Sequence, residues 1–516
     1  YMTRRDKDPY RLYFHLQPPT GWLNDPNGLC QFQGEYHVFF QYTPQDAQGR
    51  GKRSWGHYIS KDLIRWEFVG TALEPDEAFD RDGVYSGSAL VHQTPQGPEM
   101  VLYYTGNVED EADPLKIYEG RQGNTVRVSS TDGRTFSAKE KVLGNEDYPA
   151  HFTCHVRDPK VWEQDGRYYM VLGGRRDFYA MLQGISKWEE RKNITSRPEF
   201  VSDTSSGDTG AILLLASEDG RNWTVKKEIS SMQEFGYMWE CPDYFRLPQV
   251  SVLSMSPQGI EAREYQFQNK YQSGYCVLHQ DPAHTAAAEL ELGDFKEWDM
   301  GFDFYAPQTF EDEQGRRILM GWAGMPDAEY DNEPTVEQGW QHCLTMMREI
   351  IWEDGCLKQK PLEEYRTLRG DAEEYGSDHK SVDRPLELFQ SRSEKSDGTR
   401  GAWEWEMTEL MDKPFSWQLM QGKSGICLSY EEGIFCMEFV GPKANEIGRG
   451  RKQRLAKINR LDQVQIYLDT SVIEVYLNGG QTVFTSRFYM EGEATAFSHL
   501  GSGRVVCWPL RALVVK

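Results

Sequence analysis

The 516-residue sequence lacks any long hydrophobic run, and its longest apolar candidate, residues 211–216, is only as long as a strand. A membrane-spanning helix needs roughly 18 or more apolar residues, so we predict no membrane association. Positive charge is also scarce, because 57 Lys and Arg face 80 Asp and Glu. The resulting net charge of −23 would repel an extended phosphate backbone. We therefore predict no nucleic-acid partner, and this charge suits a neutral small molecule or a sugar.

Paired cysteines are absent too. The nine cysteines are an odd number, are widely scattered and form no Cys-x-x-Cys motif, which argues against both a disulfide framework and a zinc site. Residues 1–6 contain no hydrophobic stretch of the signal-peptide kind, although a trimmed sequence would give the same pattern. We predict reduced thiols in a cytoplasmic protein.

Common motifs for metals, nucleophiles and phosphates are missing as well. The sequence has no His-Glu-x-x-His, no Gly-x-Ser-x-Gly and no phosphate-loop Gly-Lys-Ser/Thr. His151 and His155 are four residues apart, but the Phe-Thr-Cys between them is typical of a strand or loop. We predict neither a metal nor a cofactor.

What the sequence does contain is a repeated strand unit. Acidic or polar residues, a proline, a short apolar strand, a glycine turn and a second apolar strand recur in residues 24–40, 157–172 and 303–320. Residues 240–245 open in the same way, and residues 85–104 keep the hairpin without the proline. Five such pairs favour a five-bladed β-propeller over a stacked sandwich. The alternative is chance, since any all-β protein contains Asp-Pro turns and hairpins closed by glycine.

The pattern changes after residue 353. Residues 357–369 have helical spacing, residues 370–384 are charged, and strand-like alternation follows at 464–468 and 471–477, closed by an Asn-Gly turn. We predict an all-β chain with a propeller at 1–353, a linker with a short helix at 354–384, and a β-sandwich at 385–516.

Three acids occupy corresponding strand starts of these units: Asp25, Asp158 and Glu240. In a propeller the innermost strands begin near one axial mouth, so these side chains should converge. Trp22 and Trp239 precede two of these acids, and with Trp55 of the Trp-Gly-His stretch at 55–57 they would stack on a sugar ring. Cleavage of a glycosidic bond needs two carboxyl groups with different protonation. The alternative is that each Asp-Pro caps a turn.

The immediate neighbours suggest a division of roles. Asn24 could hold Asp25 ionised, and Arg157 could do the same for Asp158. Trp239 and Cys241 on either side of Glu240 would favour its protonated form by desolvation.

These residues carry a family resemblance. The blocks Trp-Leu-Asn-Asp-Pro-Asn-Gly (22–28), Arg-Asp-Pro (157–159) and Glu-Cys-Pro (240–242) resemble the signatures of glycoside hydrolase family 32, the β-fructofuranosidases. Further matches lie at 39–42, 55–57, 85–88, 303–308 and 321–322. The resemblance implies a five-bladed propeller followed by a β-sandwich, and retaining hydrolysis without a metal.

The resemblance also implies roles for single residues. Asp25 corresponds to the nucleophile, Glu240 to the acid/base, and Asp158 to a transition-state stabiliser that binds fructosyl hydroxyls with Arg157. Cys241 matches the cysteine that tunes the acid/base. The positions implied to contact substrate are Trp22, Asn24, Gln41, Trp55, Tyr85, Ser86, Tyr305 and Trp322.

Finer matches at residues 15–22, 256–259 and 271–275 resemble the sucrose-6-phosphate hydrolases of that family. Val156 and Tyr85 depart mildly from the common pattern, and residues 178–206 look like an insertion that could reshape the leaving-group pocket. Three hypotheses follow: a β-fructosidase acting on sucrose or sucrose 6-phosphate, an exo-acting hydrolase of short fructo-oligosaccharides or fructans, and an inactive sugar-binding propeller. The sequence predicts no oligomeric state.

Overall fold

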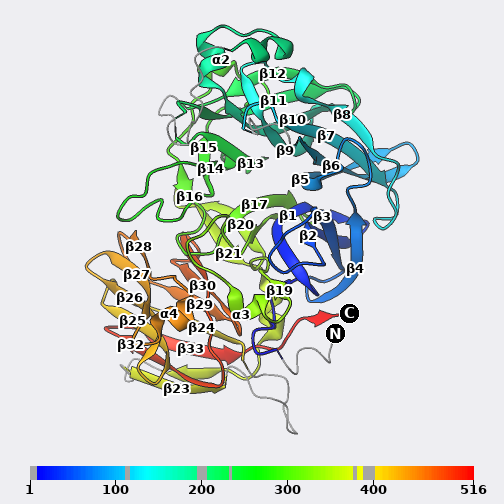
Figure 1. Ribbon diagram of the computed structural model, residues 1–516. Helices are drawn as coiled ribbons and strands as arrows, with labels where there is room; N and C mark the ends of the chain where they lie inside the picture. Colours follow the sequence, from blue (N-terminus) through cyan, green and yellow to red (C-terminus); the bar gives the residue numbers. More distant parts are fainter. Residues whose placement is uncertain (1–7, 111–116, 195–205, 232–234, 376–380, 388–400) are drawn as a thin grey trace.

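The structure is a computed structural model that describes residues 8–110, 117–194, 206–231, 235–375, 381–387 and 401–516, and it consists mostly of β-strands (Figure 1). The strands of the described residues form seven sheets. The prediction of an all-β chain is therefore confirmed. Within these residues, no helix has the length and apolar character needed to cross a membrane.

Five of the sheets draw on residues 21–361 and share one plan, in which successive strands pair antiparallel. The strands of these five sheets are β1 (Gly21–Phe32), β2 (Glu35–Thr43), β3 (Ser54–Ser60) and β4 (Arg65–Leu73); β5 (Gly83–Thr94), β6 (Gly97–Glu109), β7 (Arg121–Ser130) and β8 (Glu140–Leu143); β9 (Phe152–Gln164), β10 (Arg167–Arg176), β11 (Thr209–Ser217) and β12 (Thr224–Ile229); β13 (Met238–Arg246), β14 (Ser251–Gln258), β15 (Gly274–Leu278) and β16 (Lys296–Glu297); β17 (Tyr305–Glu311), β18 (Arg317–Trp322), β20 (Arg348–Glu353) and β21 (Cys356–Pro361). Two short strands, β19 (Trp340–Gln341) and β34 (Val514–Val515), extend the first sheet at its edges.

The first strands of the five sheets contact one another in a closed ring, in the order β1, β5, β9, β13, β17 and back to β1. Hydrophobic clusters fill the space between neighbouring sheets. One cluster packs Phe39 and Trp55 of the first sheet against Tyr104 of the second. Another packs Ile212 of the third sheet against Trp239 of the fourth. The ring therefore brings together segments that are far apart in the sequence. Short helical turns lie in the connections: η1 (Asn145–Asp147), η4 (Ala287–Glu289) and α3 (Glu333–Val336).

The stretch predicted as a linker contains more regular structure than expected. Its first part is β21, whose alternating burial and pairing with β20 make it the outer strand of the fifth sheet. The expected helix is confined to a 3-10 helix, η5 (Glu363–Leu368), which starts after the proline that ends β21. β22 (Glu373–Tyr375) already belongs to the next unit. Residues 376–380 lie outside the described residues.

The remaining chain forms two six-stranded sheets around one core of apolar side chains, which include Trp405, Trp417 and Phe435. The strands of these two sheets are β22, β33 (Arg504–Pro509), β24 (Trp403–Thr408), β29 (Val464–Leu468), β30 (Val472–Leu477) and β31 (Thr482–Arg487); β23 (Ser381–Glu387), β32 (Glu493–Leu500), β25 (Phe415–Gln421), β26 (Ser424–Glu431), β27 (Ile434–Val440) and β28 (Gln453–Lys457). A short helix, α4 (Ala444–Gly448), packs beside β26 and β27. The last strand, β34, returns to pair with β4, and just before it the N–H of Leu513 donates to the carbonyl of Tyr13 at 2.8 Å, so the end of the chain lies beside the first described segment (Figure 1).

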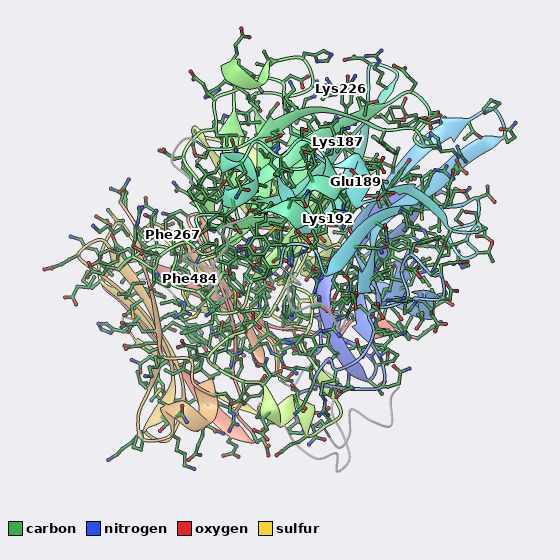
Figure 2. The ribbon with its side chains drawn as sticks, turned by 45° about the horizontal axis from the view of Figure 1, so that its top comes forward. Lys187, Glu189, Lys192, Lys226, Phe267 and Phe484 are labelled. Carbon is green, nitrogen blue, oxygen red and sulfur yellow. The ribbon has the colours of Figure 1, made fainter. Side chains whose placement is uncertain are left out.

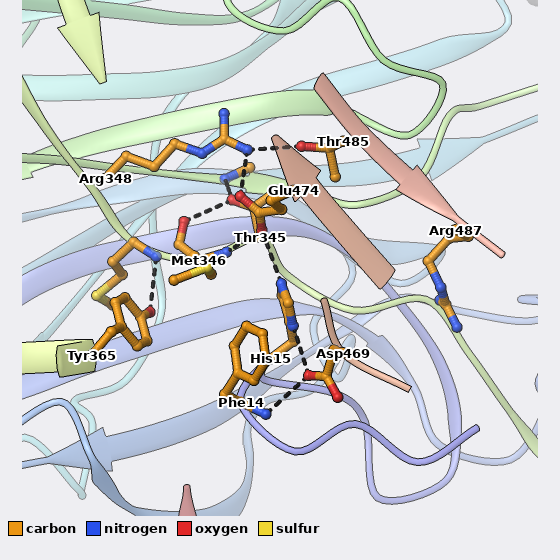
Figure 3. Close-up of polar contacts among 12 residues, drawn as sticks. Phe14, His15, Thr345, Met346, Arg348, Tyr365, Asp469, Glu474, Thr485 and Arg487 are labelled. Atoms are coloured by element: carbon orange, nitrogen blue, oxygen red, sulfur yellow. Dashed lines mark hydrogen bonds and ion pairs between the residues drawn. The ribbon is translucent and has the colours of Figure 1, made fainter. Parts of the chain in front are cut away.

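A buried ionic cluster joins the N-terminal segment to this second unit (Figure 3). His15 bridges two carboxylates, with Nδ1 2.9 Å from Asp469 Oδ2 and Nε2 2.9 Å from Glu474 Oε1. The other oxygen of Glu474 accepts a hydrogen bond of 2.8 Å from Arg348, which also pairs with Asp299. All five side chains are fully buried.

Burial alone would lower the pKa of His15, but the hydrogen bonds to Asp469 and Glu474 outweigh burial and raise the pKa. Stabilisation by a group whose pKa is raised on folding is complete below its unfolded pKa and is lost as pH rises through its folded pKa. We therefore expect this cluster to stabilise the fold in acidic and neutral solution and to weaken in alkaline solution.

Replacing His15 should reveal how the stability supplied by this cluster depends on pH. His15→Gln leaves the buried Asp469 without a cation and Glu474 with Arg348 alone, so we expect a loss of about 3–5 kcal/mol in the free energy of unfolding below neutral pH. The difference from the wild type should shrink as pH rises, which urea unfolding across a pH series would measure. His284→Gln, at a half-exposed histidine, is the matched control. A pH-independent difference between the His15 variant and the wild type would contradict a protonated His15.

Candidate active site

Each of the five first strands has, at a corresponding place, one residue more than the strand that it pairs with. The predicted site residues cluster at these places. These β-bulges lie between Leu23 and Pro26, Val84 and Gly87, Arg157 and Lys160, Glu240 and Asp243, and Tyr305 and Gln308. Asp158, Cys241 and Ala306 have positive φ angles of 66°, 45° and 49° within three of the bulges. A bulge bends the strand and re-aims its side chains. The bulges thus turn side chains of five strands toward one mouth of the ring.

That mouth holds a cavity of about 450 Å³. Eleven of the predicted site residues line it, and it therefore brings together the three acids that the sequence placed far apart. The eleven are Trp22, Asn24, Asp25, Gln41, Tyr85, Ser86, Arg157, Asp158, Glu240, Tyr305 and Trp322. Trp55 and Cys241 are not part of its lining.

Asp25 is held by hydrogen bonds to both carboxylate oxygens. Asn24 Nδ2 donates to Oδ1 at 3.1 Å, and the Ser86 hydroxyl donates to Oδ2 at 2.5 Å. Burial raises the pKa of Asp25, although the hydrogen bonds from Ser86 and Asn24 oppose this rise. The contact predicted between Asn24 and Asp25 is present, but burial decides the direction of the pKa shift.

Glu240 is surrounded by donors, and this corrects the expectation that Trp239 packs against its carboxyl group. Arg157 donates to Oε1 through Nε at 3.2 Å and Nη2 at 2.6 Å. The Tyr305 hydroxyl, at 2.7 Å, and Gln258 Nε2, at 2.8 Å, donate to Oε2. Trp239 instead packs into the hydrophobic cluster behind the strand, because it faces the other side of β13. Both oxygens of the Glu240 carboxyl group therefore accept hydrogen bonds from side chains of neighbouring strands.

Asp158 also differs from the expectation that Arg157 keeps it ionised. Burial raises the pKa of Asp158 to about 7, and Arg157 opposes the rise only in part. The reason is that the guanidinium hydrogen-bonds to Glu240 and approaches Asp158 no closer than 4.0 Å. The Asp158 carboxylate accepts its hydrogen bond from the backbone N–H of Cys241 at 2.9 Å.

Two predicted contact residues support the site from behind. Trp55 is fully buried between the first two sheets and donates to the backbone carbonyl of Tyr85 at 3.0 Å. It therefore positions Tyr85, which corrects its assignment as a substrate contact. The Cys241 thiol lies 3.6 Å from Asp25 Oδ2 and 3.5 Å from Asp158 Oδ2. Burial and both carboxylates raise the pKa of this thiol, so it remains a donor shared between the two acids.

A ring of buried polar side chains begins just beyond the bulges and ties neighbouring strands together. Asn27 donates to the backbone carbonyl of Asp25 at 3.1 Å and accepts from the N–H of Gly87 at 3.0 Å. Gln308 donates to the carbonyl of Gly87 at 2.6 Å, and Asp243 accepts from the N–H of Thr309 at 2.6 Å. These bonds fix the bulges relative to one another, which preorganises the acids above them.

Sequence reasoning missed several residues that line the cavity. They are Gly51, Arg53, Asp82, Arg121, Gln258, Pro326 and Asp327. Gln258 had a weak signal, because it lies in a stretch that resembles the sucrose-6-phosphate hydrolases, but that resemblance gave it no role. The other six lie outside the recognised motifs.

The described part of the predicted insertion contains α2 (Phe178–Leu182) and the 3-10 helix η2 (Trp188–Asn193). Figure 2 labels Lys187, Glu189 and Lys192 beside the third sheet. The buried Arg191 fastens η2 to the backbone carbonyls of Ala150 and Phe152 at the start of β9. None of residues 178–194 lines the cavity, and residues 195–205 lie outside the described residues.

Comparisons with known proteins agree with this geometry. Residues 15–201 and 199–361 match the family model described as the glycosyl hydrolases family 32 N-terminal domain, and residues 442–508 match the family 32 C-terminal model. A sucrose-6-phosphate hydrolase of Bacillus subtilis (strain 168) is 35% identical over 490 residues, which cover 94% of this chain and 90% of the relative. A raffinose invertase of Escherichia coli is 32% identical, with 94% and 90% covered.

Solved structures show the same fold. A sucrose-6-phosphate hydrolase from Lactobacillus gasseri superposes with a TM-score of 0.79 at 24% identity, over 99% of this chain and 95% of that one. A family 32 β-fructofuranosidase of Bombyx mori gives a TM-score of 0.75 at 27% identity, with 98% and 95% covered. A variant of the Bombyx mori enzyme has been solved in complex with sucrose.

Proposed function

Because this chain belongs to glycoside hydrolase family 32, we propose that it hydrolyses the bond between a terminal β-fructofuranosyl group and the glucosyl group of sucrose or sucrose 6-phosphate. The observation that carries this proposal is the convergence of Asp25, Asp158 and Glu240 in one cavity beside Trp22 and Trp322. A buried cavity with paired carboxyl groups and aromatic walls suits a sugar at its base.

The proposed reaction is a double displacement at fructose C2. Asp25 attacks C2 as the bond to the leaving oxygen breaks, and Glu240 gives its proton to that oxygen. Glu240 then removes a proton from water, which attacks C2 and releases Asp25 as a carboxylate. The fructose formed keeps its β configuration because two inversions occur at the same carbon.

Glu240 must carry a proton when the first step begins. Arg157 and Gln258 can only donate through their N–H groups, whereas the Tyr305 hydroxyl can also accept. We therefore infer that the proton sits on Oε2 of Glu240 and that Tyr305 accepts it until the leaving oxygen takes its place. Asp158 and Arg157 are proposed to bind the hydroxyls of the fructosyl group.

The five sheets around the ring are proposed to be the blades of a five-bladed propeller, and the two six-stranded sheets a β-sandwich. The closed ring of first strands supports this proposal. We place the end of the propeller at Pro361 instead of residue 353, because β21 pairs with the fifth sheet. The linker then covers residues 362–372, and the sandwich begins at β22.

The compartment also remains a proposal. All nine cysteines are free thiols in the structure. Thiols of this kind are typical of reducing compartments, which supports a cytoplasmic location. The absence of a nucleic-acid or membrane partner stays a prediction.

A kinetic panel tests the function. We expect fructose release from sucrose and sucrose 6-phosphate to have the highest kcat/KM, with 1-kestose slower and inulin slowest. Faster turnover of inulin than of sucrose and sucrose 6-phosphate would favour the exo-acting fructan hydrolase. Release of no fructose from any of the four substrates would favour the inactive sugar-binding propeller. Activity is expected to survive EDTA, since we predict that no metal takes part.

A further inference from the structure

Two guanidinium groups besides that of Arg157, those of Arg53 and Arg121, line the same cavity as the three acids. Arg53 lies just before β3, and its Cζ is 5.4 Å from the centre of the Trp22 ring. Arg121 begins β7, with its Cζ 5.9 Å from the centre of the Tyr85 ring. A methyl group built on Gly83 would lie 2.7 Å from Tyr85 and 3.7 Å from Cβ of Arg53, so Arg53 also packs beside this tyrosine. The two cations therefore flank Tyr85.

Neither arginine has its charge and all its hydrogen-bond donors satisfied by the described residues. Arg53 donates through Nη1 to Thr43 Oγ1 at 2.8 Å and to the carbonyl of Gly49 at 2.5 Å, both of which are neutral. Among the described residues, no carboxylate forms an ion pair with it. Burial lowers the pKa of Arg53, as expected for a cation removed from water without a counterion.

Arg121 is satisfied on one side only. Its Nη2 pairs with Glu109 at 2.8 Å, whereas its Nε is buried and has no hydrogen-bond partner in the described part of the chain. A buried donor without an acceptor is costly, and a ligand that supplies one removes the cost.

Asp82, another acid of the lining, does not cancel the charges of Arg53 and Arg121. Asp82 lies between the first two sheets, but its Oδ2 accepts the N–H of Glu109 at 2.9 Å and pairs with Arg81 at 3.1 Å. Hydrogen bonding to these groups outweighs burial and lowers the pKa of Asp82. Asp82 thus already has a cation of its own.

The charge of the surroundings indicates which ligand Arg53 and Arg121 would bind. The protein carries a net charge of −23, and the cavity holds three carboxyl groups at its base. A neutral sugar needs no cation there, whereas a phosphate monoester of about −2 would be repelled unless local positive charge offset the field. Guanidinium groups bind phosphate through paired, charge-assisted hydrogen bonds.

We propose that Arg53 and Arg121 bind a phosphate group on the leaving-group sugar, which makes the 6-phosphate of sucrose 6-phosphate the feature that they select. The inference rests on the proposed function, because it assumes that the fructosyl group occupies the three acids. The glucosyl group then lies toward the side of the cavity where the arginines flank Tyr85.

The test compares kcat/KM for sucrose 6-phosphate and for sucrose in the wild type, Arg53→Gln and Arg121→Gln. Loss of one charge-assisted hydrogen bond should lower the ratio of the two kcat/KM values by about ten- to a hundredfold in either variant. Arg134→Gln is the control: it removes the same charge from an exposed arginine that pairs with Glu35, outside the cavity. Its ratio should match the wild type.

Inhibition gives a second measurement that does not depend on turnover of the phosphorylated substrate or on the folding of a variant. Glucose 6-phosphate should inhibit wild-type sucrose hydrolysis more strongly than glucose does, and added salt should weaken this preference. Equal inhibition by the two, or an unchanged ratio in both arginine variants, would overturn the phosphate site while leaving the proposed function intact. Absence of fructose release from either substrate by the wild type would instead overturn the proposed function.

Discussion

Asp25→Ala should lower kcat on sucrose by about 10⁴-fold, the scale seen when a group essential to a covalent mechanism is removed. The loss should appear in kcat more than in KM, since Ser86, Arg157 and the aromatic walls still bind the sugar. The same substitution at Asp354, an exposed residue of the β20–β21 turn, is the control and should leave kcat unchanged.

The nucleophile assignment also predicts the acid side of the pH profile. Asp25 must be ionised to attack, so kcat/KM should fall as pH decreases through its pKa. Burial raises that pKa, and the acid limb should therefore lie above the value of about 3.9 for a free aspartate. Azide should restore turnover to Asp25→Ala by taking the place of the carboxylate, and it should yield the fructosyl azide of inverted configuration. Near-normal activity of Asp25→Ala without azide would contradict the assignment.

Glu240→Gln should lower kcat on sucrose by about 10²–10⁴-fold, the usual contribution of general acid–base catalysis. Glutamine preserves the shape of the side chain and still offers an oxygen to Arg157, so the variant should fold and bind sucrose. What it loses is the transferable proton.

Substrates with different leaving groups distinguish the loss of the Glu240 proton from a general loss of structure in Glu240→Gln. A β-fructofuranoside whose leaving group needs no protonation should react with Glu240→Gln in the first step almost as fast as with the wild type. Glu431→Gln, at an exposed glutamate of β26, is the matched control. An equal loss for activated and natural leaving groups would show that Glu240 does not act as the acid.

The chemistry of the site was easier to predict from the sequence than its electrostatics. Asp25, Asp158 and Glu240 could be identified because each is followed, within two residues, by a proline at a corresponding point of a strand unit. Which neighbour faces each acid could not be predicted, since a bulge shifts the alternation of side chains. Trp239 and Trp55 consequently point into the core, although both are close in sequence to site residues.

Partners that come from other strands were beyond sequence reasoning. Arg157 was placed with Asp158 because the two are adjacent, yet it reaches across to Glu240 on the next first strand. Gln258 approaches the same carboxylate from β14. The strand β21, within the stretch predicted as a linker, was not foreseen for a similar reason: its pairing with β20 could not be read from the local spacing of apolar residues.

Of the three carboxylates in the cavity, we expect Asp25 alone to become bonded to fructose. Glu240→Gln incubated with an activated β-fructofuranoside should accumulate the covalent intermediate, because the variant lacks the base that activates water for the second step. Digestion and mass spectrometry should then find one fructosyl group on the peptide that contains Asp25. A fructosyl group on Asp158, or consumption of the donor with no modified carboxylate, would contradict the account.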